Sequence, residues 1–151
     1  MREILFRGQR KDNGEWIEGS TIWFDDELCF IMPSYPNAST LTYAQLFALT
    51  AKMVDPETVG QYTGLNDKNG NKIFEGDVLK RKLKSFLSFY HPRMKVVFIP
   101  GKACFAAVDI DGSNVKFISD YINNKYELEK IGNIHDNPEL VGNSDKLEEL
   151  E

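Results

Sequence analysis

The chain has 151 residues, of which 42% are hydrophobic, 27% charged and 12% aromatic. This length and composition are typical of one folded domain with a substantial core, and they exclude a collagen-like, mucin-like or wholly disordered protein. The net charge of -5 argues against a surface built throughout to coat nucleic acid, although it is compatible with a local basic patch.

The first third of the chain predicts a three-stranded meander. Its apolar runs, bounded by polar turns, span residues 3–8, 15–23 and 28–32. The first two runs flank Asn13 and Gly14, a pair that favours a hairpin because both residues tolerate positive φ. Pro33 and Pro36 end the third strand, since proline cannot continue a paired strand.

The next part of the chain predicts a short helix and two strands. Residues 40–47 begin with Thr40 as a helix cap, and residues 48–53 alternate in polarity as a strand does. Pro56 closes that strand, because the residue before a proline is kept out of the α region. The following strand is expected over residues 58–63.

Turns rich in Asn, Asp and Gly predict the remaining strands. They recur about every 8 to 15 residues, the spacing of an all-β meander, sandwich or barrel. The turns lie at residues 66–70, 75–77, 101–102 and 109–112. Within residues 72–80 the turn at 75–77 leads into a strand, and further strands are expected over residues 95–100, 103–109, 115–118 and 126–134.

The end of the chain differs from the rest. Asn137, Pro138 and Glu139 combine a cap, a first-turn proline and a first-turn acid, and so predict a short helix from residue 138. Residues 141–151 are acidic with few apolar groups, and this tail is expected to fray. The whole pattern predicts a mainly β protein, a small barrel or meander of antiparallel strands with a short C-terminal helix, as one domain over residues 1–140.

The cysteines and the length of the apolar runs indicate the cellular compartment in which the protein is expected. Cys29 and Cys104 are the only cysteines, and each lies in an apolar stretch where a thiol packs as a small hydrophobe. This excludes a disulfide framework and favours a reducing setting. The first residues lack a signal-peptide core, and no run approaches the roughly 18 apolar residues of a membrane span. We therefore expect a cytoplasmic protein without a membrane partner.

Three segments carry a family resemblance. Residues 54–78 read VDPETVGQYTGLNDKNGNKIFEGDV, residues 6–20 read FRGQRKDNGEWIEGS, and residues 131–140 read IGNIHDNPEL. In this order they resemble the YopX protein family of phages and prophages of bacteria. The resemblance implies a β-rich, barrel-containing fold and carriage on a mobile element, with no established activity, substrate or catalytic residue. His135 stands where that family usually has an aromatic residue, and residues 80–95 follow none of its patterns.

Two acidic turns invite comparison with calcium loops. Asp67 begins one run of alternating oxygen-bearing residues, and Asp109 begins another. An EF-hand loop needs glycine at its sixth position and glutamate at its twelfth, whereas Lys72 and Val78 stand there in the first run. In both runs glycine comes fourth, where a β-turn uses positive φ. We interpret both as turns, and we expect no metal site and no cofactor.

The remaining polar groups do not assemble a catalytic motif. His91 and His135, with two dispersed cysteines, form no zinc motif within one segment. Asp136 beside His135 would face the opposite side of a continuing strand, so a turn histidine is the preferred interpretation. Two of the carboxylates Glu57, Glu75 and Asp77 could meet across neighbouring strands as an acid and base pair, but we favour backbone capping, with Asp77 accepting from nearby amides. No residue is assigned as catalytic.

The most unevenly charged segment spans residues 80–95 and contains no acid. Its cations and aromatic residues are Lys80, Arg81, Lys82, Lys84, Phe86, Phe89, Tyr90, Arg93 and Lys95. Such a mixture is typical of single-stranded nucleic-acid binding, in which cations follow phosphates and rings stack on bases. The structural alternative is that the rings are buried and the lysines protect a strand edge against aggregation.

Together these patterns predict a non-catalytic binding module, an accessory protein of a phage or prophage. Its partner is expected to be another protein or a second copy of itself, bound through strand edges or apolar surface such as Trp23, Phe24 and Phe30. Binding of single-stranded nucleic acid through residues 80–95 is the alternative hypothesis. An enzyme of unknown type is the third, because a barrel can host a site that no motif announces.

Overall fold

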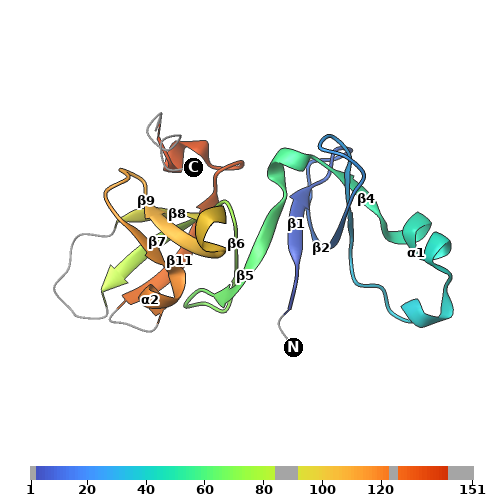
Figure 1. Ribbon diagram of the computed structural model, residues 1–151, viewed down its shortest axis with the longest axis horizontal. Helices are drawn as coiled ribbons and strands as arrows, with labels where there is room; N and C mark the ends of the chain where they lie inside the picture. Colours follow the sequence, from blue (N-terminus) through green and yellow to red (C-terminus); the bar gives the residue numbers. More distant parts are fainter. Residues whose placement is uncertain (1–2, 84–91, 123–125, 143–151) are drawn as a thin grey trace. The chain divides into compact units, whose positions relative to one another are not determined.

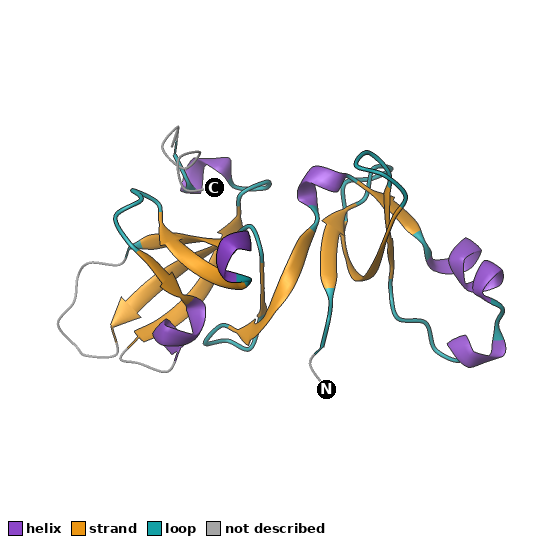
Figure 2. Cartoon of the chain, viewed as in Figure 1, coloured by secondary structure: helices purple, strands orange, loops and turns teal. Residues whose placement is uncertain are grey.

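The computed structural model describes residues 3–83, 92–122 and 126–142. The chain is mainly β, as predicted, with two antiparallel sheets and few helices (Figure 1, Figure 2). It packs as two compact units, residues 1–62 and 63–151. The described strands form no closed barrel, so the barrel and the single domain over residues 1–140 stay predictions.

The first unit is a sheet with three short helical elements. Its strands are β1 (Phe6–Gln9), β2 (Trp16–Trp23), β3 (Cys29–Met32), β4 (Lys52–Val54) and the start of β5 (Gly60–Asn66). Its helical elements are η1 (Ala38–Thr40), α1 (Tyr43–Thr50) and η2 (Pro56–Thr58). The strands pair in the order β4-β3-β2-β1-β5.

The β1–β2 hairpin confirms the turn predicted at Asn13 and Gly14. Gly14 has a φ of 73°, which an L side chain rarely adopts and glycine tolerates. The backbone N–H of Arg10 donates to the carbonyl of Glu15 at 2.9 Å and closes the hairpin. The third predicted strand is present as β3, which pairs with both β2 and β4.

Helix α1 begins and ends later than the sequence predicts. Thr42, not Thr40, is its cap: the Thr42 hydroxyl accepts from the Gln45 N–H, and the Gln45 side chain accepts from the Thr42 N–H. This reciprocal capping box satisfies two amides at once and favours the later start. Because α1 continues to Thr50, the first half of the strand predicted over residues 48–53 is wrong, and only β4 remains of it.

One face of the first sheet holds a small core. Cys29, Ile31 and Val54 are completely buried, and Ile17 and Val59 pack against them. Burial raises the pKa of the Cys29 thiol, so this residue packs as a neutral hydrophobe, as predicted. Because side chains alternate along a strand, the residues of β3 between these buried ones lie on the other face of the sheet.

The second unit is built mainly from a five-stranded sheet. Its strands are β6 (Lys72–Phe74), β7 (Asp77–Leu83), β8 (Arg93–Ile99), β9 (Cys104–Asp109), β10 (Val115–Phe117) and β11 (Tyr126–Asn133). Its helical elements are η3 (Pro100–Lys102), α2 (Ile118–Ile122) and η4 (Pro138–Leu140). Five strands pair in the order β10-β9-β8-β7-β11, and β6 pairs with β5.

The sequence predicted most of these strands but not α2. The expected strand over residues 115–118 ends at Phe117, because Ile118 begins the helix. The C-terminal helix expected from residue 138 is a single 3-10 turn in the described chain. Beyond residue 142 the predicted tail lies outside the described residues.

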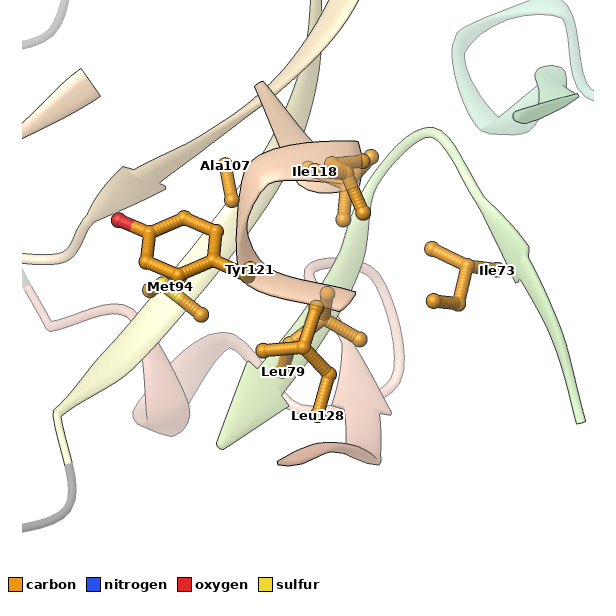
Figure 3. Packing of buried hydrophobic residues seen from close by; sticks show 8 residues of the cluster. Ile73, Leu79, Met94, Ala107, Ile118, Tyr121 and Leu128 are labelled. Carbon is orange, nitrogen blue, oxygen red and sulfur yellow. The ribbon is translucent and has the colours of Figure 1, made fainter. Parts of the chain in front are cut away.

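The core of the second unit explains why α2 forms. Ile118 and Tyr121, one helical turn apart, point from α2 toward the sheet and are each 1% exposed (Figure 3). Leu79, Met94 and Leu128 meet them from β7, β8 and β11. The helix is therefore stabilised by the apolar sheet beneath it rather than by its own short sequence.

The tight turn between β6 and β7 confirms the capping role predicted for Asp77. Gly76 has a φ of 80°, and Asp77 is completely buried. The carboxylate of Asp77 accepts from the Phe74 N–H at 2.8 Å and lies 3.3 Å from Nζ of Lys130. A buried carboxylate held in this way orients the turn and joins it to β11.

Among the helices of the described residues, none has the length and apolarity that a membrane crossing requires.

Candidate nucleic-acid interface

The first acidic turn is held together by its own carboxylate. Asp67 is buried, and its Oδ1 accepts from the N–H groups of Asn69 at 2.8 Å and Asn71 at 2.9 Å. Its Oδ2 accepts from the N–H of Lys130, in β11, at 3.1 Å. Burial alone would raise the pKa of Asp67, but these donors together lower it. The interpretation of this run as a turn is confirmed.

The second acidic turn is built in the same way. Oδ2 of Asp109 accepts from Nδ2 of Asn114 at 2.8 Å, and Oδ1 of Asp111 accepts from the N–H of Ser113 at 2.9 Å. The hydrogen bonds from Ser113 lower the pKa of Asp111. Gly112 has a φ of 71°, as a turn glycine requires. In the part of the chain that the structure describes, no three potential metal ligands gather.

His135 lies in the turn that follows β11, as predicted. The N–H groups of His135 and Asp136 both donate to Oδ1 of Asn133 at 2.9 Å, and Nδ2 of Asn133 donates to Asp136 at 2.7 Å. These hydrogen bonds shape the turn around Asn133. His91 lies outside the described residues.

The structure divides the cations of segment 80–95 between two faces of the second sheet. Lys80 lies opposite Arg93 in the β7–β8 register, and Val78 lies opposite Lys95. Directly opposed residues share a face, as do alternate residues of one strand. Four cations therefore occupy one face, which we call the basic face: Lys80, Lys82, Arg93 and Lys95. Of these, Lys82 and Arg93 are exposed, and the other two are half-buried.

The basic face carries net positive charge. None of its four cations forms an ion pair with a described residue. Glu127 and Glu129 of β11 lie opposite Lys82 and Lys80 in register, but the Glu129 carboxylate binds Nζ of Lys68 at 2.7 Å. The hydrogen bond between the Lys68 ammonium and the Glu129 carboxylate raises the pKa of Lys68. The two acids thus share this face along β11 and are outnumbered there by the four cations.

The position of β7 and β8 bears on the alternative explanation of the lysines, protection of a strand edge against aggregation. Each strand is paired on both sides, β7 with β8 and β11, and β8 with β7 and β9. Lysines that protect a sheet against aggregation are needed on edge strands, where backbone groups are open to pairing. Edge protection therefore does not explain the cations of the basic face.

Arg81 lies on the opposite face, with the core. Its Nη1 donates to the hydroxyl of Tyr121 at 3.2 Å, and its guanidinium lies 5.2 Å from the Tyr121 ring centre and 5.1 Å from that of Tyr126. Burial raises the pKa of Tyr121, which keeps its hydroxyl neutral. Arg81 therefore packs α2 and β11 together. The sequence signal for this position is strand alternation, because Arg81 is two residues after the buried Leu79 of β7 and so shares its face.

The other predicted binding residues are not placed. Lys84, Phe86, Phe89 and Tyr90 lie outside the described residues, so the expectation that rings stack on bases rests on the sequence.

The fold and the basic face define a mainly β protein of two antiparallel sheets with one cationic sheet face. The family model described as "YopX protein" matches residues 5–142, and the chain therefore belongs to the YopX protein family. The predicted family resemblance is confirmed.

A solved structure supports the fold. The chain is similar to the crystal structure of protein EF1440 from Enterococcus faecalis, with a TM-score of 0.55 and 23% sequence identity. The match covers 93% of this chain and 99% of that chain. None of the curated proteins matches the chain.

Proposed function

We propose that the protein is a non-catalytic binding protein whose basic face binds single-stranded nucleic acid. The observation that supports this function is the set of four cations on one face of two interior strands, none of them paired with a described carboxylate. Lys80 and Arg93 are directly opposed, and like charges in that arrangement destabilise a sheet by about 0.2–1 kcal/mol. A bound polyanion would offset that cost.

The shape of the basic face favours an extended ligand. Alternate residues of a strand lie roughly 6.7 Å apart, so two adjacent strands present two parallel rows of cations. A phosphate backbone supplies anions at regular intervals along such rows, and contacts of this kind do not depend on sequence. Because the whole chain carries -5, binding is confined to this face rather than spread over the surface.

The expected salt dependence follows from the number of cations. Four phosphate contacts on a single strand predict a slope of about -3 in log affinity against log salt, or about 50-fold weaker binding at 200 mM than at 50 mM. Fluorescence anisotropy with a labelled oligonucleotide of mixed sequence measures this directly. Absence of binding at low salt would overturn the proposal.

A matched pair of variants tests the location. Lys82→Glu with Arg93→Glu changes two exposed cations of the basic face and should weaken binding at least about tenfold at low salt. Lys11→Glu with Lys102→Glu makes the same change in net charge at two exposed positions elsewhere and should change affinity less than about twofold. Equal losses in both variants would mean that net charge, not the basic face, governs binding.

The bordering acids provide a test in the opposite direction. Glu127→Gln removes a negative charge that lies opposite Lys82 and should tighten binding. A decrease in affinity would place the nucleic acid elsewhere.

A further inference from the structure

Residues 143–151, which we call the tail segment, carry charge opposite to that of the basic face. They contain four acids and one lysine, so their net charge is -3, and they lie outside the described residues. None of the four cations of the basic face forms an ion pair with a described residue. Opposite charges on one chain attract each other where the chain can bring them together. The position at which the tail segment begins decides which cations it reaches.

The described chain leaves the second sheet on the side of the basic face. Gly132 of β11 lies opposite Val78 of β7, and Val78 lies opposite Lys95 of β8, so these three residues share the basic face. A Cβ at Gly132 would meet the side chains of Asn137 and Leu140, and Val78 is completely buried. The turn η4 therefore packs over the basic side of the sheet. The tail segment begins three residues after Leu140, within about 10 Å of this point.

The tail segment is long enough to cover the basic face. From Val78 the face extends four residues along β7 to Lys82, which is about 13 Å, and one strand spacing of about 4.8 Å across to β8. Nine residues of extended chain span up to about 30 Å. The tail segment can therefore contact every cation of the basic face while the described residues keep their positions.

Other cations of the second unit are held elsewhere. Lys68 and Lys130 already form ion pairs with carboxylates of this unit. Arg81 and Lys116 lie on the opposite face of the sheet, beside the ring of Tyr121. The basic face thus offers four cations together on the side from which the chain leaves the sheet.

We propose that the tail segment binds the basic face of its own chain and competes there with nucleic acid. The competition rests on the proposed function, whereas the binding of the tail segment does not. Exposed ion pairs are individually weak and are screened by salt, so the tail segment is readily displaced. A nucleic-acid strand carries a negative charge at every nucleotide, whereas the tail segment carries -3 over nine residues. A long single strand therefore displaces the tail segment, and anions of lower charge density do not.

Carbodiimide cross-linking of the full chain, without nucleic acid, tests the binding of the tail segment. The reagent joins a carboxylate to a lysine amine when the two are in contact, and mass spectrometry identifies the linked peptides. The ion pair between Lys68 and Glu129, 2.7 Å apart, is the positive control. Links from acids of the tail segment to the lysines of the basic face are expected at low salt, and they should diminish as salt rises. Those lysines are Lys80, Lys82 and Lys95.

The opposite face of the same sheet provides the negative control for cross-linking. Lys116 is exposed there and should form few links with the tail segment. Equal linking to Lys116, or no links to the basic face while Lys68 and Glu129 are joined, would overturn the proposal. Links between isotopically labelled and unlabelled chains in a mixture would also overturn it, because they would place the tail segment on a second copy.

Neutralising the tail segment tests the competition. The variant combines Asp145→Asn, Glu148→Gln, Glu149→Gln and Glu151→Gln. It should bind a labelled single-stranded oligonucleotide at least about threefold more tightly than wild type at about 50 mM salt. The difference should close by about 200 mM, because salt screens the tail segment as well. The slope of about -3 in log affinity against log salt then belongs to the variant, and wild type should show a shallower one.

A control variant removes the same charge elsewhere. Glu18→Gln, Asp25→Asn, Asp26→Asn and Glu27→Gln make the same change in net charge at exposed positions of the first unit, and should alter affinity less than about twofold. Equal tightening in both variants, or none in the tail variant, would overturn the competition. If neither wild type nor the tail variant binds the oligonucleotide at low salt, the proposed function and the competition fail together. The cross-links then still decide the binding of the tail segment.

Discussion

The carboxylate of Asp67 should contribute most of the stability of the turn between β5 and β6. Asp67→Ala removes the acceptor for three backbone N–H groups, those of Asn69, Asn71 and Lys130. The first two lie in an exposed turn where water replaces the lost acceptor, at about 0.5 kcal/mol each. The N–H of Lys130 lies within β11, and an unsatisfied donor there costs about 1–3 kcal/mol. We therefore expect the free energy of unfolding to fall by about 2–4 kcal/mol.

The effect of Asp67→Ala should depend on pH with a definite sign. The folded state lowers the pKa of Asp67, so its stabilising contribution is present above the unfolded value of about 3.9 and is lost as pH falls through the lower folded pKa. The difference in free energy of unfolding between wild type and Asp67→Ala should therefore have its full value at neutral pH and shrink below about pH 4.

The measurement must report on the second unit. Trp16 and Trp23, the only tryptophans, are both in the first unit, so urea unfolding is better followed by far-ultraviolet circular dichroism and by amide exchange at Lys130. Asp111→Ala is the matched control, because Asp111 also holds an Asx-type turn but is exposed and bonds only locally. An equal loss in both variants, or a loss from Asp67→Ala that does not change with pH, would refute the reasoning.

Two further substitutions test the packing of each unit. Gly19→Ala should destabilise the first unit by about 2–4 kcal/mol, because its Cβ would collide with the backbone carbonyl oxygen of Met32. Gly101→Ala, with nothing within 4 Å of its Cβ, should be close to neutral in the same urea titration. Arg81→Met should lower the thermal stability of the second unit by about 1–3 kcal/mol, because it removes the hydrogen bond to Tyr121 and the contacts with two rings. Unchanged unfolding of Arg81→Met would return this residue to the candidate binding surface.

The candidate site was only partly predictable. The sequence indicated residues 80–95 as unusually basic, and it could not show that Lys80 lies opposite Arg93 while Arg81 packs under α2. Those positions depend on the pairing of β7 with β8 and with β11, and β11 begins more than forty residues after Arg81. A composition pattern treats neighbouring cations as one group, whereas a strand sends alternate side chains to opposite faces.

The sequence by itself determined the turns. Asn-Gly and Asp-containing turns were predicted correctly because positive φ at Gly14 and Gly70, and side-chain hydrogen bonds such as that from the Asn69 N–H to the Asp67 carboxylate, arise within four or five residues. Only the tertiary structure decided that α2 forms at Ile118 and that the chain packs as two units. Short helices and sheet partners have little local preference to guide them, and their stability comes from apolar surface supplied by distant strands.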